Sequence, residues 1–269
     1  MSEAAAETSD RILLERHGRV LKAVNNDPKT LNALSWDFYD GFRRAVEEAG
    51  ADPAIGALVL TGAGGFFCSG GNVRGLKERS AADYATRRSS VDRLHGMILA
   101  MRACPKPIIA AVDGGAAGAG ASIMAACDLI VAARDAYVSV AYIRIGLTPD
   151  GGSTAFFGTA LPRQLVSEMI FTGDRIPAER LHAAGMVNRL AEPGGALPVA
   201  MEWAAQIAAQ PSRALARGKK LIEAARLNPL KAQLDAEADD IAEALAGPEG
   251  QEGIDAFLAK RKPDWDRVR

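Results

Sequence analysis

Apolar and polar positions alternate with a strand period in several short segments of the first two thirds of the chain. Residues 11–24 alternate around His17-Gly18 and lead into a turn, which is typical of a hairpin. Short apolar runs bounded by glycine or polar residues predict further strands at 57–60, 108–112, 129–133 and 137–141. The sequence therefore predicts a sheet built from short strands.

Helical periodicity fills the intervals between these strands and dominates the last third of the chain. Ser35 is the predicted N-cap of a helix that runs to about Ala49. In residues 80–103 apolar positions recur at i, i+3, i+4 and i+7 from Leu94, and His95 lies beside that stripe. Further helices are predicted at 162–170, 177–184, 197–209, 211–226 and 230–245. Strands that alternate with helices indicate an α/β fold with helices layered on a sheet.

One change of composition, near residue 195, divides the chain. We interpret residues 11–195 as the α/β core and residues 196–269 as a helical region that packs on the core or on another subunit. Residues 1–10 are acidic and rich in alanine, and they are expected to be disordered.

Composition and charge exclude several classes of protein. Lys and Arg number 32 and Asp and Glu 33, so the formal net charge is −1 and no basic cluster indicates a nucleic-acid partner. Apolar stretches stay far below the ~18 residues of a membrane helix. Residues 1–10 lack the basic start and apolar run of a signal peptide, so a cytoplasmic location is expected.

Cysteine and histidine usage gives no sign of a disulfide framework or a metal site. The cysteines are Cys68, Cys104 and Cys127, an odd number without C-x-x-C spacing, and all are expected to be reduced. The three histidines are widely separated and form no H-E-x-x-H motif.

Two common catalytic motifs are missing, and a third is incomplete. The chain has neither the G-x-S-x-G of serine hydrolases nor the G-x-x-x-x-G-K-[ST] phosphate loop. Gly115-x-x-Gly118-x-Gly120 follows a predicted strand and opens a helix, but its glycines are in the reverse order of the dinucleotide fingerprint. No acidic residue ends a second strand about 20 residues later, so NAD is not expected to bind.

Two glycine-rich segments each follow a predicted strand: residues 66–72, the first glycine loop, and residues 114–120, the second glycine loop. Ordinary turns and close packing are one interpretation. The other is that free backbone N–H groups bind an anion or a carbonyl oxygen. Two convergent donors of this kind stabilise a thioester oxyanion, each by about 2.7–4 kcal/mol.

An ordered series of motifs resembles the enoyl-CoA hydratase/isomerase (crotonase) superfamily. The resemblance runs from about residue 11 to the C-terminus and rests on Asn32-Ala33-Leu34, Phe66-Phe67-Cys68-Ser69-Gly70-Gly71-Asn72, Lys106-Pro107-Ile108-Ile109-Ala110-Ala111-Val112, Gly118-Ala119-Gly120, Cys127-Asp128-Leu129, Gly146-Leu147-Thr148-Pro149-Asp150-Gly151-Gly152 and Leu161-Pro162-Arg163. Residues 257–263 also resemble the closing helix of that family.

The resemblance implies a crotonase-like spiral of ββα units with a helical C-terminal region that builds a homotrimer or a dimer of trimers. It implies an acyl-CoA thioester substrate whose carbonyl oxygen binds the backbone N–H groups of Gly71 and Ala119. Coenzyme A is then part of the substrate, and no metal or redox cofactor is expected. Lys29 and Lys260 are the residues expected to bind it.

The chain departs from the typical hydratase pattern at two positions. Where such hydratases carry the two glutamates that position water, this sequence has Ser122 and Tyr142, which we place in the substrate pocket. Asp150 remains, and it resembles the single acid/base of isomerase-type members. Pro-Asp-Gly is also a favoured turn and Asp a good helix N-cap, so a structural role for Asp150 is the alternative.

The first hypothesis is therefore an enoyl-CoA isomerase in which Asp150 shuttles a proton. The alternatives are an enoyl-CoA hydratase or oxepin-CoA-type hydrolase in aromatic or fatty acid degradation, and a non-catalytic oligomer that binds acyl-CoA. Residues 70–73, 148–150 and 161–165 also resemble members linked to phenylacetyl-CoA breakdown, including epoxyphenylacetyl-CoA isomerases.

Overall fold

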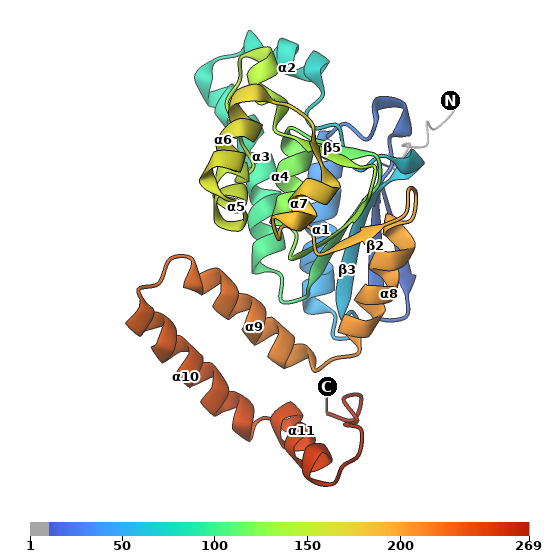
Figure 1. The fold of residues 1–269 in the computed structure, drawn as a ribbon, viewed down its shortest axis with the longest axis vertical. Coiled ribbons are helices and arrows are strands. Elements are labelled where there is room, and N and C mark those ends of the chain that lie inside the picture. The colour runs from blue at the N-terminus through green and yellow to red at the C-terminus, as the bar shows by residue number, and fades with distance from the viewer. Residues whose placement is uncertain (1–10, 269) are drawn as a thin grey trace, which may run out of the picture.

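The computed structural model describes residues 11–268, and their strands form two sheets (Figure 1). The strands are β1 (Ile12–His17), β2 (Val20–Asn25), β3 (Ala57–Gly62), β4 (Ile108–Val112), β5 (Gly115–Ala117), β6 (Leu129–Ala133), β7 (Tyr137–Ser139), β8 (Ile176–Pro177) and β9 (Arg189–Ala191). The larger sheet has the order β1-β2-β3-β4-β6-β9, with β1 antiparallel to β2 and the other neighbours parallel. The smaller sheet has the order β5-β7-β8. The disorder predicted for residues 1–10 concerns residues outside the described range.

Each predicted strand is present in the structure, and one of them is shorter than predicted. The hairpin around His17-Gly18 pairs β1 with β2, and the apolar runs form β3, β4 and β6. β7 ends at Ser139 rather than at Ala141, because its partner β5 ends opposite Ser139 and leaves the following residues unpaired. β5, β8 and β9 were not predicted, because two or three residues are too few to show a period.

The helices of the described residues cover the sheets and then continue beyond them. They are α1 (Trp36–Ala51), α2 (Val73–Ser80), α3 (Tyr84–Ala103), α4 (Ala119–Ala126), α5 (Ser153–Ala160), α6 (Arg163–Thr172), α7 (Ala178–Ala183), α8 (Ala196–Ala208), α9 (Ser212–Ala225), α10 (Leu230–Ala246) and α11 (Pro248–Leu258), with 3-10 turns η1 (Pro28–Thr30), η2 (Ala63–Gly65) and η3 (Ala141–Ile145).

Local sequence explains where α1 begins and why α2 was not predicted. Ser35 caps α1 as predicted, since its Oγ accepts the Phe38 N–H at 3.2 Å. The 80–103 segment forms α3 from Tyr84 onward. α2 buries none of its residues and so carries no apolar stripe, although Asn72 caps it by accepting the Arg74 N–H at 3.0 Å.

The two faces of the larger sheet are covered differently. One face packs with helices α1, α3 and α4 into the main core, which includes Phe42, Met97 and Met124. On the other face α8 packs alanines spaced four residues apart, Ala196 to Ala208, against Val59 and its neighbours. Small side chains let this helix lie close to the sheet. The α/β class is therefore confirmed. The division near residue 195 stays a prediction, and α8 packs on the sheet.

Helices α9, α10 and α11 extend to one side of the two sheets (Figure 1). The helix predicted over 257–263 is wrong in its extent, because α11 runs from Pro248 to Leu258 and Lys260 has a left-handed φ of 53°. The left-handed Lys260 cannot continue the helix, and its N–H donates instead to the Phe257 carbonyl oxygen at 3.1 Å. No helix within residues 11–268 is long and apolar enough to cross a membrane.

Candidate active site

The two glycine loops lie against each other. A backbone bridge joins Cys68 to Ala116, and the Ala117 N–H donates to the Cys68 carbonyl oxygen at 2.9 Å. A Cβ on Gly70 would lie 2.6 Å from the Ala117 carbonyl oxygen, and a Cβ on Gly120 would lie 2.6 Å from that of Cys68. No side chain fits between backbones this close, so the contact between the loops requires these two glycines.

Two backbone N–H groups in these loops are available to a ligand. Among residues 11–268, neither the Gly71 N–H nor the Ala119 N–H donates a hydrogen bond to the protein. An added Cβ on Gly71 would have Leu76, at 3.7 Å, as its one neighbour within 4 Å. Ala119 begins α4, and its N-cap Gly118 has no side chain to cap the helix. The two donors can therefore serve a carbonyl oxygen that becomes negatively charged.

Asp150, Tyr142 and Ser122 form one hydrogen-bonded group. The Tyr142 hydroxyl donates to Asp150 Oδ1 at 2.6 Å. Ser122 Oγ lies 3.2 Å from Tyr142 Oη and donates to the Asp150 backbone carbonyl at 2.9 Å. Ser122 follows Ala119 by about one helical turn on α4. The structure thus brings the predicted carboxylate to the helix that carries the second predicted donor.

The turn that carries Asp150 is packed against α4. Gly151 has a φ of 61°, and a Cβ there would lie 2.9 Å from the Ser122 Cβ. The N-cap of α5 is Gly152, two residues after Asp150. The alternative interpretation of Asp150 as a helix N-cap is therefore wrong, and its carboxylate is held by Tyr142 instead.

Burial dominates the electrostatics of this group. It raises the pKa of Asp150, although the hydrogen bond from Tyr142 and the charge of His95 act in the opposite direction. Burial and the charge of Asp150 also raise the pKa of Tyr142, so the phenol keeps its proton at neutral pH. A carboxylate with a raised pKa accepts a proton more readily than a solvated one.

Cys68 lies in the first glycine loop but is not an activated nucleophile. Burial raises the pKa of its thiol to about 12. All three cysteines are buried and free. Cys68 therefore acts as a small apolar residue in the contact between the loops.

Two residues near Asp150 were not predicted as site residues. His95, half-buried on α3, acts electrostatically on Asp150. Tyr39 on α1 has a pKa that burial raises, with further increases from the charges of Asp150 and Cys68, so it lies near both the carboxylate and the first loop. In the sequence, the position of His95 beside the apolar stripe of its helix was the one signal that could have indicated a residue near the site.

The two lysines predicted to bind coenzyme A lie in different parts of the chain. Lys29 is exposed in η1, and this turn adjoins the first glycine loop because Ser69 Oγ donates to the Thr30 carbonyl at 2.9 Å. Lys260 is exposed just after α11. Within residues 11–268 the backbone of Lys260 forms no hydrogen bond with either glycine loop. The described residues also contain no cluster of three or more His, Cys, Asp or Glu side chains that could hold a metal ion.

Comparisons with known proteins agree on one class. The pattern of the family described as Enoyl-CoA hydratase/isomerase matches residues 15–268. A 1,2-epoxyphenylacetyl-CoA isomerase of Escherichia coli is 31% identical over 247 residues, which cover 91% of this chain and 94% of that protein. A 2,3-dehydroadipyl-CoA hydratase of the same organism is 30% identical, with 94% and 98% covered.

The solved structures give the same result for the fold. The crystal structure of an enoyl-CoA hydratase from Polaromonas sp. JS666 superposes with a TM-score of 0.92 at 41% identity, covering 94% of this chain and 98% of that one. The two sheets and the matched length define an acyl-CoA enzyme of the crotonase fold, as expected. The chain belongs to the enoyl-CoA hydratase/isomerase family.

Proposed function

We propose that this protein is an enoyl-CoA isomerase in which Asp150 carries a proton between two carbons of the acyl chain. The observation that supports it is the environment of Asp150. The carboxylate is half-buried, its pKa is raised, and a hydrogen bond fixes it beside the helix that begins at Ala119. A positioned base of this kind contributes about 10²–10⁴-fold in rate.

In the proposed reaction the Gly71 and Ala119 N–H groups bind the thioester oxygen. This makes the carbon beside the thioester more acidic, because the enolate that forms places negative charge on that oxygen. Asp150 removes a proton from this carbon, and the electrons of the broken C–H bond move into the dienolate. The protonated Asp150 then donates to the far carbon of the dienolate and returns to its ionised form.

The residues at the two glutamate positions support isomerisation over hydration. Ser122 and Tyr142 hydrogen-bond to each other and to Asp150, and neither is a carboxylate that could activate water at neutral pH. Hydration stays the second candidate, because the relative at 30% identity is named a hydratase. An unreactive acyl-CoA-binding protein is the third.

For the substrate we propose an enoyl-CoA derived from an aromatic ring. The support is the printed name of the 31% identical relative, a 1,2-epoxyphenylacetyl-CoA isomerase. Lys29 and Lys260 are proposed to bind the coenzyme A portion of this substrate.

We also propose that the protein is a homotrimer or a dimer of trimers. Large apolar side chains lie exposed on α9, α10 and α11: Ile222, Leu230, Leu234, Ile241, Leu245, Ile254, Phe257 and Leu258. Burying such side chains against other copies would remove apolar surface from water. Sedimentation equilibrium distinguishes the trimer, the hexamer and a monomer, and a monomer would contradict the proposal.

The deciding experiment uses deuterated, oxygen-18 water. The purified protein is incubated separately with crotonyl-CoA, a 3-enoyl-CoA and a ring-derived enoyl-CoA, and products are read by mass spectrometry. A shifted double bond without oxygen-18 is the expected result, and deuterium in the product reports exchange of the carboxyl proton with solvent before its return. Oxygen-18 in the product would establish hydration or hydrolysis instead. Binding without a shifted double bond or oxygen-18 would favour the unreactive protein.

A further inference from the structure

The hydrogen bonds around Tyr142 have a fixed direction. A carboxylate only accepts, so the 2.6 Å contact between Tyr142 Oη and Asp150 Oδ1 uses the single phenol proton of Tyr142. In its 3.2 Å contact with Ser122 Oγ, Tyr142 is then the acceptor. Ser122 therefore has one proton for two acceptors, Tyr142 Oη and the Asp150 carbonyl at 2.9 Å. Tyr142 thus holds the side chain of Asp150, and Ser122 holds its backbone carbonyl.

The two oxygens of the Asp150 carboxylate are not equivalent. Oδ1 accepts the phenol proton, whereas Oδ2 receives no hydrogen bond from residues 11–268 and is not among their buried polar atoms without a partner. The other titratable groups near Asp150 are His95 from α3 and Tyr39 from α1, and neither donates a hydrogen bond to it within the described chain. Tyr142 is thus the group that distinguishes the two oxygens.

We propose that Tyr142 is the positioning residue of the Asp150 base: it holds Oδ1 and leaves Oδ2 as the oxygen that takes up and returns the substrate proton. This inference rests on the proposed isomerase function. In the first step the substrate C–H bond breaks and an O–H bond forms at Oδ2; in the second step that bond breaks and a C–H bond forms at the other carbon. Tyr142 keeps its own proton in both steps and touches no reacting atom.

The hydrogen bond also sets the proton affinity of the base. A donor stabilises the ionised form of a carboxylate more than the protonated form. Tyr142 therefore offsets part of the rise in the pKa of Asp150 that burial causes. Removing the phenol hydroxyl should raise that pKa further, so the carboxylate would be ionised only at higher pH.

The test compares Tyr142→Phe with Tyr39→Phe. Each substitution removes one phenol hydroxyl near Asp150, but Tyr142 alone of the two donates to the carboxylate. For Tyr142→Phe we expect kcat for the double-bond shift of a 3-enoyl-CoA to fall on the order of tenfold to a hundredfold. KM should change little, and the acid limb of the pH profile should move to higher pH. For Tyr39→Phe the acid limb should stay in place.

A second measurement does not depend on turnover. Carbon-13 NMR of aspartate-labelled protein without substrate follows the titration of the Asp150 carboxyl, assigned by its loss in Asp150→Asn. Tyr142→Phe should raise this pKa, and Ser122→Ala should raise it by less. An unchanged carboxyl pKa, together with an unchanged acid limb, in Tyr142→Phe would overturn the inference and leave the isomerase function standing. A wild-type protein that shifts no double bond would overturn the isomerase function, while the NMR titration still tests the hydrogen bond.

Discussion

Two partly buried carboxylates of this protein, Asp128 and Asp150, have opposite surroundings. Asp128 Oδ2 accepts from Lys219 Nζ at 2.7 Å and from the Ile108 N–H at 2.8 Å, and its Oδ1 accepts from Arg102 at 3.2 Å. The Asp150 carboxylate accepts one hydrogen bond from the described residues, donated by the neutral phenol of Tyr142. The first carboxylate has two cations beside it, and the second has none in hydrogen-bonding contact within the described residues.

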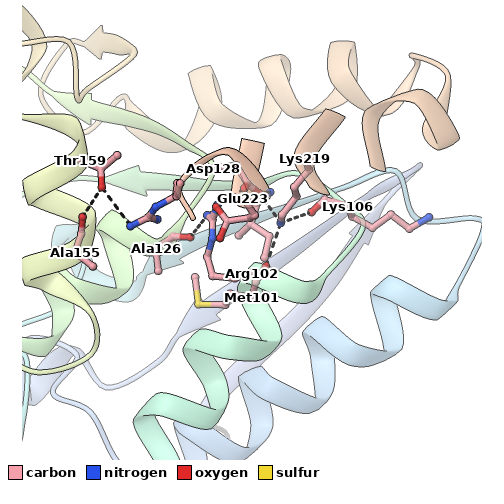
Figure 2. A network of polar contacts seen from close by, with 11 residues as sticks. Met101, Arg102, Lys106, Ala126, Asp128, Ala155, Thr159, Lys219 and Glu223 are labelled. Carbon is pink, nitrogen blue, oxygen red and sulfur yellow. Dashed lines mark hydrogen bonds and ion pairs between the residues drawn. The ribbon is translucent and has the colours of Figure 1, made fainter. Parts of the chain in front are cut away.

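Figure 2 shows how the paired carboxylate serves the fold. Lys219 on α9 also donates to the carbonyl oxygens of Met101 and Lys106, at 3.0 and 3.1 Å. Glu223, one turn later, pairs with Arg102. Burial would raise the pKa of Glu223, but the hydrogen bond and charge of Arg102 lower it overall. Charges compensated in this way attach α9 to the core.

The difference shows what separates a structural carboxylate from a reactive one in the same chain. Burial costs both of them hydration. At Asp128 the neighbouring cations stabilise the buried negative charge. At Asp150 no cation of the described residues forms a hydrogen bond with the carboxylate, and burial raises the pKa of the carboxyl. A residue kept in this costly state is the kind expected at a site of proton transfer.

The largest expected effect separates activity from stability. Asp150→Asn should lower kcat about 10²–10⁴-fold, because the amide cannot accept the substrate proton. Its free energy of unfolding at neutral pH should not fall, since a buried charge with a raised pKa is removed. The rate of the double-bond shift gives kcat, and urea denaturation gives the free energy of unfolding. A variant with the kcat of the wild-type protein would place the proton chemistry at another residue.

The reverse pattern is expected at the structural carboxylate. Lys219→Met leaves Asp128 without its closest cation and should cost about 3–5 kcal/mol of unfolding free energy. The neighbouring Lys220 has 76% of its side chain exposed, so Lys220→Met is the matched control and should change stability by less than ~0.5 kcal/mol. Equal denaturation curves for both variants would contradict a stabilising role for the buried pair.

Two glycine variants extend the comparison to the glycine loops. Gly71→Ala meets no close protein atom, so it should keep its stability but lose about 10²-fold in kcat/KM by obstructing the thioester oxygen. Gly120→Ala places its Cβ 2.6 Å from the Cys68 carbonyl and should be clearly destabilised. If Gly71→Ala kept full activity, that residue would not be an oxyanion donor.

The smallest expected effect is a pH dependence. The pKa of Asp150 is raised in the folded state, so activity should be lost as pH falls through a value above the ~3.9 of a free aspartate. Ionisation of Asp150 disfavours the folded state, so stability relative to Asp150→Asn should decrease as pH rises through that same pKa. Paired denaturation curves across this range test the sign. A wild-type protein that gains relative stability with rising pH would show that Asp150 has a lowered pKa.

Most regular elements could be predicted from sequence because their signals are local. Apolar runs identified β3, β4 and β6, the N-cap Ser35 identified α1, and the i, i+3, i+4, i+7 stripe from Leu94 identified α3. The strands β5, β8 and β9 and the helices α2 and α5 were not predicted, because strands of two or three residues show no period and helices of eight residues that bury two residues or none show no clear apolar stripe. The order and pairing of the strands depend on contacts between segments that lie far apart in the sequence.

The sequence by itself determined which residue types are available: two glycine loops, one aspartate in a turn, and Ser122 and Tyr142 at the glutamate positions of typical hydratases. Only the tertiary structure decided that Tyr142 and Ser122 hold Asp150, since hydrogen-bond partners on separate elements leave no periodic signal. The tertiary structure also decided that Asp128 contacts the cations Lys219 and Arg102, whereas the Asp150 carboxylate contacts a neutral phenol. Desolvation depends on what surrounds a carboxylate in space, and the same residue type therefore stabilises the fold at one position and is poised to accept a proton at another.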